Sequence, residues 1–497
     1  MIGRLVIRHL ALHPVRSLVF VGAYAAGVAV MLALLSIGEV MVEQSRDEQW
    51  VGGGDVTVVP AGIDLETLRT GGAAFFGIQQ SRFIARSILR GPRLAAQIEA
   101  VAPWIDDRAI YLRRSGSDTV VAVRASAVIP SAAQALEAPP ELVAGLWQDN
   151  EADRRWLEPT SFELYQEIDR FHLPPETSRS DSTWAEWHYF NLLWPGKDRW
   201  LYLSYILGGD VLGGRWGGIV LARYRTPDGS YRSFADTLSA EQIEFSTASA
   251  DLSFGPHSVQ LLDAPVRYLV RAELPGLEGG PPLSIELAIE PDSNRYFPPA
   301  LLAASDSFVS GYVVPALRGS AAGRVCVGQH CEDVGSAIAY HDHNWGTWGG
   351  VIWDWGIAHA GDLDVLYGGV HGSAAERARA RGARFLAYLV DADGVAAVLE
   401  PRELLYSGER LQRFEGVTVR VPEMLRWTAT KAADSLTAEI ALEEISLSSL
   451  TLGSDADVYF AQMAGTLRLS GVVGGRPVDQ SGPGFFETYL RQSAIER

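Results

Sequence analysis

The stretch AIAYHDHNWGTWGG (residues 337–350), with WDWG (353–356) soon after it, places ionisable side chains among indole rings. If the first stretch is a β-strand, its successive side chains point to opposite faces. The alternation divides them into two sets, with His341, His343 and Trp345 on one face and Tyr340, Asp342 and Asn344 on the other.

A second stretch, TWAEWHYFN (183–191), has the same mixture of carboxyl, imidazole and aromatic groups. As a strand it places Trp184, Glu186, His188 and Phe190 on one face, and Trp187 and Tyr189 on the other. Buried carboxyls and imidazoles need partners or a function. We therefore expect both strands to contribute to a site.

From residue 183 onward the sequence predicts strands. Apolar and polar residues alternate, as in RFLAYLVDADGVAAVL (384–399), where Asp-Gly marks a turn between two strands. Many strands with almost no helical periodicity among them are typical of antiparallel sandwiches or barrels. We predict a mainly β protein whose two C-terminal domains span 183–350 and 351–497.

The composition limits the function. The chain has 497 residues, enough for about three domains of roughly 150 residues each. Its formal net charge of −18 argues against a nucleic-acid partner, because binding phosphates requires clustered Lys and Arg.

The N-terminal region predicts a membrane anchor. Residues 18–38 carry no charged side chain, and a helix that crosses a bilayer needs about 20 such residues. Arginines precede this run and acids follow it, so the positive-inside rule places the N-terminus in the cytoplasm and the rest of the chain outside. A cleaved signal peptide is the alternative. We expect a tip and single-pass anchor of the inner membrane (1–42), a small extracytoplasmic α/β region (43–155) and a polar, proline-containing linker (156–182).

Cys326 and Cys331 are the only cysteines. If Gly328 and Gln329 form a two-residue turn, the cysteines lie directly opposite each other, which satisfies disulfide geometry. Either a disulfide or two free thiols fits the sequence.

The ionisable and aromatic residues of these two strands allow three interpretations. His341 and His343 could bind a metal, completed by Glu186, His188, His359 or His371. A carboxylic acid among indoles could instead donate a proton to an alkene, because burial raises its pKa and an indole face stabilises a cation. The third interpretation is a polar network that sets the strand register.

WAEWHYFN and AYHDHNWG resemble the paired signatures of the carotenoid hydratase (hydroxyneurosporene synthase, CrtC) and AttH-like family, and GPGFFETYL with Glu487 resembles its C-terminal segment. The resemblance covers about 180–492 and implies two lipocalin-like β-barrels. It also implies hydration of an isolated double bond, or cyclisation, with neither metal nor redox cofactor. His343, Asn344 and Trp345 match the family's H-N-W, and His188 replaces its usual Trp. Tyr367 and Asp364 are candidates for a downstream Tyr and Asp.

These residues lead to the hypothesis that the protein is a hydro-lyase or alkene cyclase. Asp342 would be the acid, with Asp354 as its substitute. Trp345 and Trp353 would stabilise the cation, and His343 and Asn344 would hold water. The remaining ligand-binding candidates are Trp184, Glu186, His188, Tyr189, Tyr340, His341, Tyr367 and Glu487.

Residues 6–39 and GGGDVTVVPAG (52–62) resemble the start of a MacB/FtsX-type ABC transporter permease. The resemblance implies ABC transporter subunits as partners. The alternative to an enzyme is therefore an accessory subunit of an ABC exporter, a carrier of an apolar molecule or lipid that performs no chemistry.

Overall fold

The computed structural model describes residues 81–113, 115–116, 119–136, 148–174, 183–195, 199–226, 229–305, 308–335, 337–348, 352–371, 386–414, 416–448 and 458–491. The predicted anchor at 18–38 and the permease-like stretches at 6–39 and 52–62 lie outside these residues. Within the described ranges, none of the helices has the length and apolar character needed to cross a membrane.

The described chain divides into two compact units, one within 100–155 and one formed by 82–99 with 156–497. The first unit contains an antiparallel hairpin followed by short helices. The elements up to the second unit's sheets are α4 (Ser81–Phe83), the π-helical turn η3 (Ile84–Leu89), β1 (Trp104–Arg113), β2 (Val120–Val128), α5 (Pro130–Ala135), α6 (Glu151–Leu157) and α7 (Ser161–Ile168).

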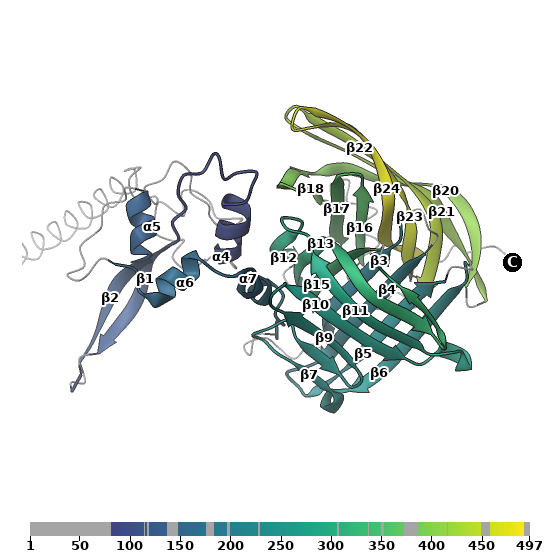
Figure 1. Cartoon of the computed structure of the whole chain (residues 1–497), viewed down its shortest axis with the longest axis horizontal. Helices are drawn as coiled ribbons and strands as arrows, with labels where there is room; N and C mark the ends of the chain where they lie inside the picture. The colour runs from purple at the N-terminus through teal and green to yellow at the C-terminus, as the bar shows by residue number, and fades with distance from the viewer. Residues whose placement is uncertain are drawn as a thin grey trace, which may run out of the picture. The chain divides into compact units, whose positions relative to one another are not determined.

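The first sheet of the second unit has 13 antiparallel strands in the order β6-β5-β4-β3-β15-β13-β11-β10-β9-β8-β7, with β12 and β14 pairing with β13. A bridge between Phe234 and Gly276 joins β6 to the segment after β10, so the sheet curls into a nearly closed barrel (Figure 1). Its elements are β3 (Trp184–Leu193), β4 (Trp200–Asp210), β5 (Arg215–Arg225), β6 (Tyr231–Ser239), η4 (Ala240–Gln242), β7 (Ile243–Phe245), β8 (Leu252–Phe254), β9 (His257–Leu262), β10 (Arg267–Leu274), η5 (Leu277–Gly279), β11 (Leu283–Pro291), β12 (Phe297–Ser305), β13 (Phe308–Val327), β14 (His330–Asp333) and β15 (Ile338–Thr347).

Alternation of apolar and polar residues explains why these segments are strands. In β11, Leu283, Ile285 and Leu287 are buried, whereas Ser284 and Glu286 between them are exposed. A period of two places one set in the barrel core and the other in solvent.

The second sheet has nine antiparallel strands in the order β19-β18-β17-β16-β24-β23-β22-β21-β20. The predicted Asp-Gly turn is confirmed, because β18 and β19 form a hairpin that places Asp391 opposite Gly394. The strands are β16 (Ile352–Ala360), β17 (Leu363–His371), β18 (Leu386–Asp391), β19 (Gly394–Leu399), β20 (Pro401–Phe414), β21 (Val417–Lys431), β22 (Asp434–Ser448), β23 (Val458–Val473) and β24 (Arg476–Arg491). The described chain is thus mainly β, as predicted.

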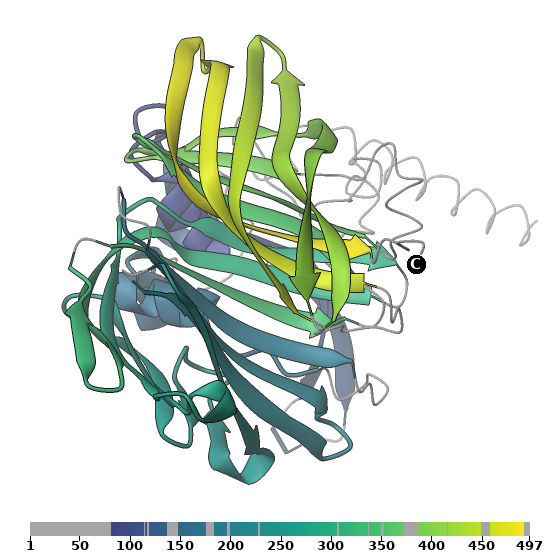
Figure 2. The same cartoon turned by 90° about the vertical axis from the view of Figure 1, so that its right-hand side faces the viewer.

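The two sheets lie against each other (Figure 2). One apolar cluster contains side chains from both of them. Tyr189 and Tyr340 come from the outer face of the first sheet, and Trp355, Ile357 and Phe485 come from the second.

Part of the predicted linker is structured. In α7, a capping box fixes the first turn, with Thr160 Oγ1 3.1 Å from the Glu163 amide nitrogen. Leu164 and Ile168 are buried, and Asp169 forms the C-cap. The polar composition of 156–182 suggested a linker, but two apolar positions four residues apart suffice to dock this short helix.

The hairpin of β13 and β14 has the predicted register. Cys326 lies opposite Cys331, and Val327 lies opposite His330. A disulfide joins the two cysteines.

Candidate functional site

Strand β15 separates two groups of polar side chains. It pairs with β3, so that His343 lies opposite His188 and Asp342 lies opposite Tyr189. Because side chains alternate, the histidines point into the first barrel and Asp342 points toward the second sheet. The predicted division of β15 into two faces is confirmed.

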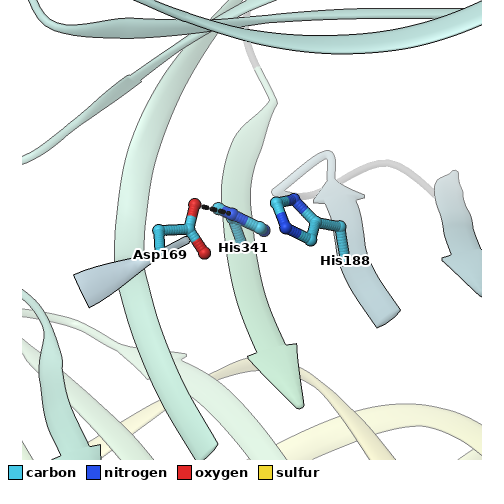
Figure 3. Close-up of side chains that lie close together, drawn as sticks. All are labelled: Asp169, His188 and His341. Carbon is cyan, nitrogen blue, oxygen red and sulfur yellow. Dashed lines mark hydrogen bonds and ion pairs between the residues drawn. The ribbon is translucent and has the colours of Figure 1, made fainter. Parts of the chain in front are cut away.

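We call the group inside the barrel the histidine–carboxylate cluster. Its members are Asp169, His172, Glu186, His188, His341 and His343. All except His172 are fully buried. Figure 3 shows the side chains of Asp169, His188 and His341, which reach one another from the end of α7, from β3 and from β15.

Asp169 connects the two histidines of β15. Its Oδ2 lies 3.0 Å from His341 Nε2, and its Oδ1 lies 2.9 Å from His343 Nδ1. The second nitrogen of His341, Nδ1, lies 3.0 Å from the carbonyl oxygen of Tyr189. His341 is therefore held between an acidic side chain and a backbone acceptor.

Glu186 closes the other side of the cluster. Its Oε1 lies 2.7 Å from His343 Nε2 and accepts a 2.7 Å hydrogen bond from the His172 amide. The ring of His172 stacks on Trp345, with 3.6 Å between centroids. His343 thus lies between two carboxyls, Asp169 and Glu186.

Contacts between carboxyls and imidazoles outweigh the effect of burial on the pKa values of Asp169 and His343, but not on that of His188. Burial alone would raise the pKa of Asp169, but attraction to His341 and His188 and hydrogen bonds to the β15 histidines hold it well below its usual value. Burial alone would lower the pKa of His343, but its hydrogen bonds to Asp169 and Glu186 raise it to about 9. Burial lowers the pKa of His188 well below its usual value.

The cluster contains two sets of metal-binding groups. Asp169, His188 and His341 form one set, and His172, Glu186 and His343 form the other, with ligand atoms within 4.8 Å of one another in each. Imidazole nitrogen and carboxylate oxygen suit divalent transition metals.

We call the group between the two sheets the intersheet site. Its members are Tyr312, Tyr340, Asp342, Asn344, Trp353, Trp355 and Glu487. The Trp355 indole donates to the Tyr312 hydroxyl over 2.9 Å, and Tyr312 lies 2.9 Å from the Tyr340 hydroxyl. Tyr340 in turn donates to Asp342 Oδ2 over 2.7 Å. This chain of donors ends on the Asp342 carboxyl.

Both carboxyls of the intersheet site have raised pKa values. Burial raises the pKa of Asp342 well above its usual value, against the hydrogen bond from Tyr340, and the nearby Glu487 raises it further. Burial raises the pKa of Glu487 to about 7, although the Trp353 indole and the Gln462 amide donate to it. Each carboxyl therefore favours its neutral form more than an exposed acid does.

Asp354 and Tyr367 lie elsewhere, on the face of the second sheet that forms its own core. Asp354 accepts hydrogen bonds from Tyr406 over 2.8 Å and from Thr488 over 2.5 Å. Tyr367 packs against Trp427 and Phe486 in the same core. A cavity of about 290 Å³ has Tyr406 and Thr488 in its lining.

The candidate residues therefore fall into three places. The first barrel holds Trp184, Glu186, His188, His341, His343 and Trp345; the intersheet site holds Tyr340, Asp342, Asn344, Trp353 and Glu487, with Tyr189 beside it; the second sheet holds Asp354 and Tyr367. A catalytic group built from Asp342, His343 and Trp345 would need a bulge in β15 to bring them to one face, and β15 pairs with β3 without a shift in register. His343 and Trp345 cannot hold water or stabilise a cation beside Asp342, because they point to the other face of β15.

His359 and Asp364 form another group. His359 Nδ1 lies 2.8 Å from Asp364 Oδ1, and Arg295 and Arg318 also contact that carboxyl. His359 is therefore not a partner of the β15 histidines, and Asp364 is neutralised by arginines.

Four residues of these sites were not predicted. Asp169 and His172 belong to the segment interpreted as a linker, and Tyr312 lies in a long strand without an ionisable motif. Trp355 is the second tryptophan of WDWG, to which the sequence motif assigns no role. Its alternation with Asp354 in β16 could have shown that only Trp353 and Trp355 face Asp342.

No family model matches the chain, and its sequence matches no curated protein. Solved structures similar to it include a candidate AttH protein from Nitrosomonas europaea (14% identity, TM-score 0.44, covering 65% of this chain and 98% of that chain). They also include kievitone hydratase from Nectria haematococca (12%, 0.41, covering 66% and 94%). A third is CghA with Sch210972 (11%, 0.43, covering 67% and 96%).

Proposed function

We propose that the protein binds an apolar isoprenoid or lipid-like molecule at the intersheet site and adds water across an isolated double bond. The observation that carries this proposal is the burial of the Asp342 carboxyl between the sheets, which raises its pKa although Tyr340 donates a hydrogen bond to it. The rings of Tyr312, Tyr340 and Trp355 lie beside that carboxyl and offer an apolar alkene surfaces to pack against.

The proposed reaction has three steps. Neutral Asp342 transfers its proton to one alkene carbon, and the resulting cation lies against the indoles of Trp353 and Trp355. Water then forms a bond to the cationic carbon, and Glu487 accepts the proton that the water loses. Glu487 then releases this proton to solvent and Asp342 takes one up, so that both carboxyls return to their starting forms and the net change is addition of one water molecule.

Substitution of the acid tests this proposal. The purified protein is incubated with an acyclic carotenoid in water labelled with ¹⁸O, and hydroxylated product is measured by mass spectrometry. We expect Asp342→Asn to lower its formation by about 100-fold or more. The matched control is Asp354→Asn, a buried carboxyl on the next strand that lies in the second sheet, and it should keep the activity. Equal rates in both variants would rule out Asp342 as the acid.

A second candidate is a carrier that performs no chemistry, such as the accessory subunit of an ABC exporter. The observation that favours it is that both oxygens of Asp342 already accept hydrogen bonds, Oδ2 from Tyr340 and Oδ1 from Asn344 over 2.9 Å. A carboxyl satisfied in this way can serve as a fixed polar support. Unmodified lipid recovered from the native protein at stoichiometric amount, with no hydrated product, favours the carrier.

We also propose that the chain acts at the outer surface of the inner membrane. The support is the uncharged run 18–38, with arginines before it and acids after it. Alkaline carbonate extraction should leave the full chain in the membrane fraction. Protease added to spheroplasts should digest the C-terminal barrels.

A further inference from the structure

We propose that the first barrel contains a divalent transition-metal site whose ligands are Asp169, His188 and His341, with zinc as the expected ion. The site lies on the opposite face of β15 from Asp342, and its existence does not depend on the proposed hydration. It differs from the expectation of a metal-free protein that followed from the sequence resemblance.

The hydrogen bonds of His341 require a positive charge at this position. Its Nδ1 lies 3.0 Å from the Tyr189 carbonyl oxygen, which can only accept, so the ring proton of a neutral imidazole resides there. The lone pair on Nε2 then faces the Asp169 carboxylate at 3.0 Å. Two electron-rich atoms at this distance repel each other unless a proton or a metal ion lies between them.

The surroundings of His188 favour a metal ion over a proton between Asp169 and His341. Both of its ring nitrogens are buried, and neither has a hydrogen-bond partner. A polar network held by protons gives no reason for an imidazole here, since a buried unpaired nitrogen destabilises the fold. A metal ion bonded to Asp169 and His341 supplies a partner for one of the two His188 nitrogens.

The surroundings of His341 match those of a metal-binding histidine. A ligating histidine commonly donates its second ring N–H to a backbone carbonyl, as His341 does to Tyr189. His343 Nδ1 lies 2.9 Å from the second oxygen of Asp169, where it can orient the carboxylate as a ligand.

The ligand atoms of Asp169, His188 and His341 need to move only a short distance to reach the spacing of a zinc site. Ligands of a four-coordinate zinc ion lie roughly 3.3 Å apart, given bonds of about 2.0–2.1 Å. Asp169 and His341 are already at 3.0 Å, and the ligand atoms of the set lie within 4.8 Å. Asp169, His188 and His341, all fully buried, supply three protein ligands and leave one position of a four-coordinate ion for water or another group.

The decisive variant is His188→Phe. The ring of His188 stacks on Phe171 with 4.8 Å between centroids and an interplanar angle of 5°, so that a phenyl ring fits the same packing. If protons hold the cluster, this variant keeps or gains stability, because it removes an unsatisfied polar group. If a metal holds the cluster, the variant loses both the ion and stability.

The full chain is expressed in medium supplemented with zinc and purified without chelator, and its metal content is measured by plasma mass spectrometry. We expect about one equivalent per wild-type chain and at least a tenfold decrease in His188→Phe. Asp342→Asn, one residue from two histidines but on the opposite face, is the matched control and should keep the ion. Dipicolinate should lower the melting temperature of the wild type, and zinc should restore it, with no effect on His188→Phe.

Cobalt supplies an independent measurement. Wild-type protein grown with Co²⁺ should show visible d–d bands that are absent in His188→Phe. The proposal is overturned if the wild type contains neither zinc, cobalt, iron nor manganese. It is also overturned if His188→Phe keeps the same metal content, or if it is at least as stable as the wild type loaded with metal.

Discussion

Asp342 and His343 are neighbours in the chain, yet their side chains belong to different sites on opposite faces of β15. Asp342 accepts a hydrogen bond from Tyr340 between the sheets, whereas His343 lies between Asp169 and Glu186 inside the barrel. A single motif therefore supplies two chemically separate groups, and substitutions at alternate positions should have separable effects.

Tyr340→Phe should destabilise the protein through the intersheet site alone. The hydroxyl of Tyr340 is buried and donates to Asp342 over 2.7 Å, so its removal leaves a buried acceptor short of a donor. We expect a loss of about 1–3 kcal/mol in the free energy of unfolding. Urea denaturation measures it. In a double-mutant cycle with Asp342→Asn, the two losses should not add, and additivity would show that the residues do not interact.

Glu487→Gln should flatten the pH dependence of stability. The pKa of Glu487 rises from 4.5 to about 7 on folding, because burial disfavours the charged form. The folded state therefore holds the proton more tightly, and the associated stability is present below about pH 4.5 and lost as the pH rises to about 7. Urea denaturation across this window should show a smaller decline in Glu487→Gln than in the wild type. Parallel curves would contradict the assigned pKa.

Asp364→Asn should weaken the contact between the two sheets at neutral pH. Burial alone would raise the pKa of Asp364, but His359 and the guanidinium groups of Arg318 and Arg295 lower it. Arg295 and Arg318 belong to the first sheet's chain segment and Asp364 to β17, so these ion pairs join the sheets. A lowered pKa gives stability that is present above about pH 4 and lost as the pH falls further. The difference between wild type and variant in urea should therefore shrink in acid; a constant difference would argue against the ion pairs.

Replacing both cysteines by serine should cost about 2 kcal/mol. The disulfide between Cys326 and Cys331 closes a loop with a sequence separation of 5, so it removes little entropy from the unfolded chain. Urea denaturation of the double variant measures the loss. Alkylation of the native wild type followed by mass spectrometry should detect no free thiol, and two alkylated cysteines would exclude the bond.

The sequence predicts strands and faces better than it predicts partners. A period of two sorted His341 and His343 from Asp342, because alternation is a local property of a strand. It could not show that Asp169 reaches the histidines from more than 170 residues away, because the tertiary contact of a short helix leaves only a weak local pattern.

The same limit explains the misplaced roles. Asp354 and Trp353 are adjacent in β16 and were both assigned to the chemistry of Asp342, although strand geometry sends one of them into the second sheet's core. Applying alternation to β16 as well as β15 would have separated them. Tyr312 lies in β13, which pairs with β15, and only the register of those two strands brings it to Asp342.

The capping box that starts α7 also has a consequence for how this protein can be dissected. A shorter chain that begins at β3 would enclose three imidazoles with Glu186 as their single anionic counterpart, since Asp169 enters from outside the sheet. Such a truncation would lack the carboxylate that contacts His341 and His343. We therefore expect the minimal independently folding fragment to include α7 and its N-cap, Thr160.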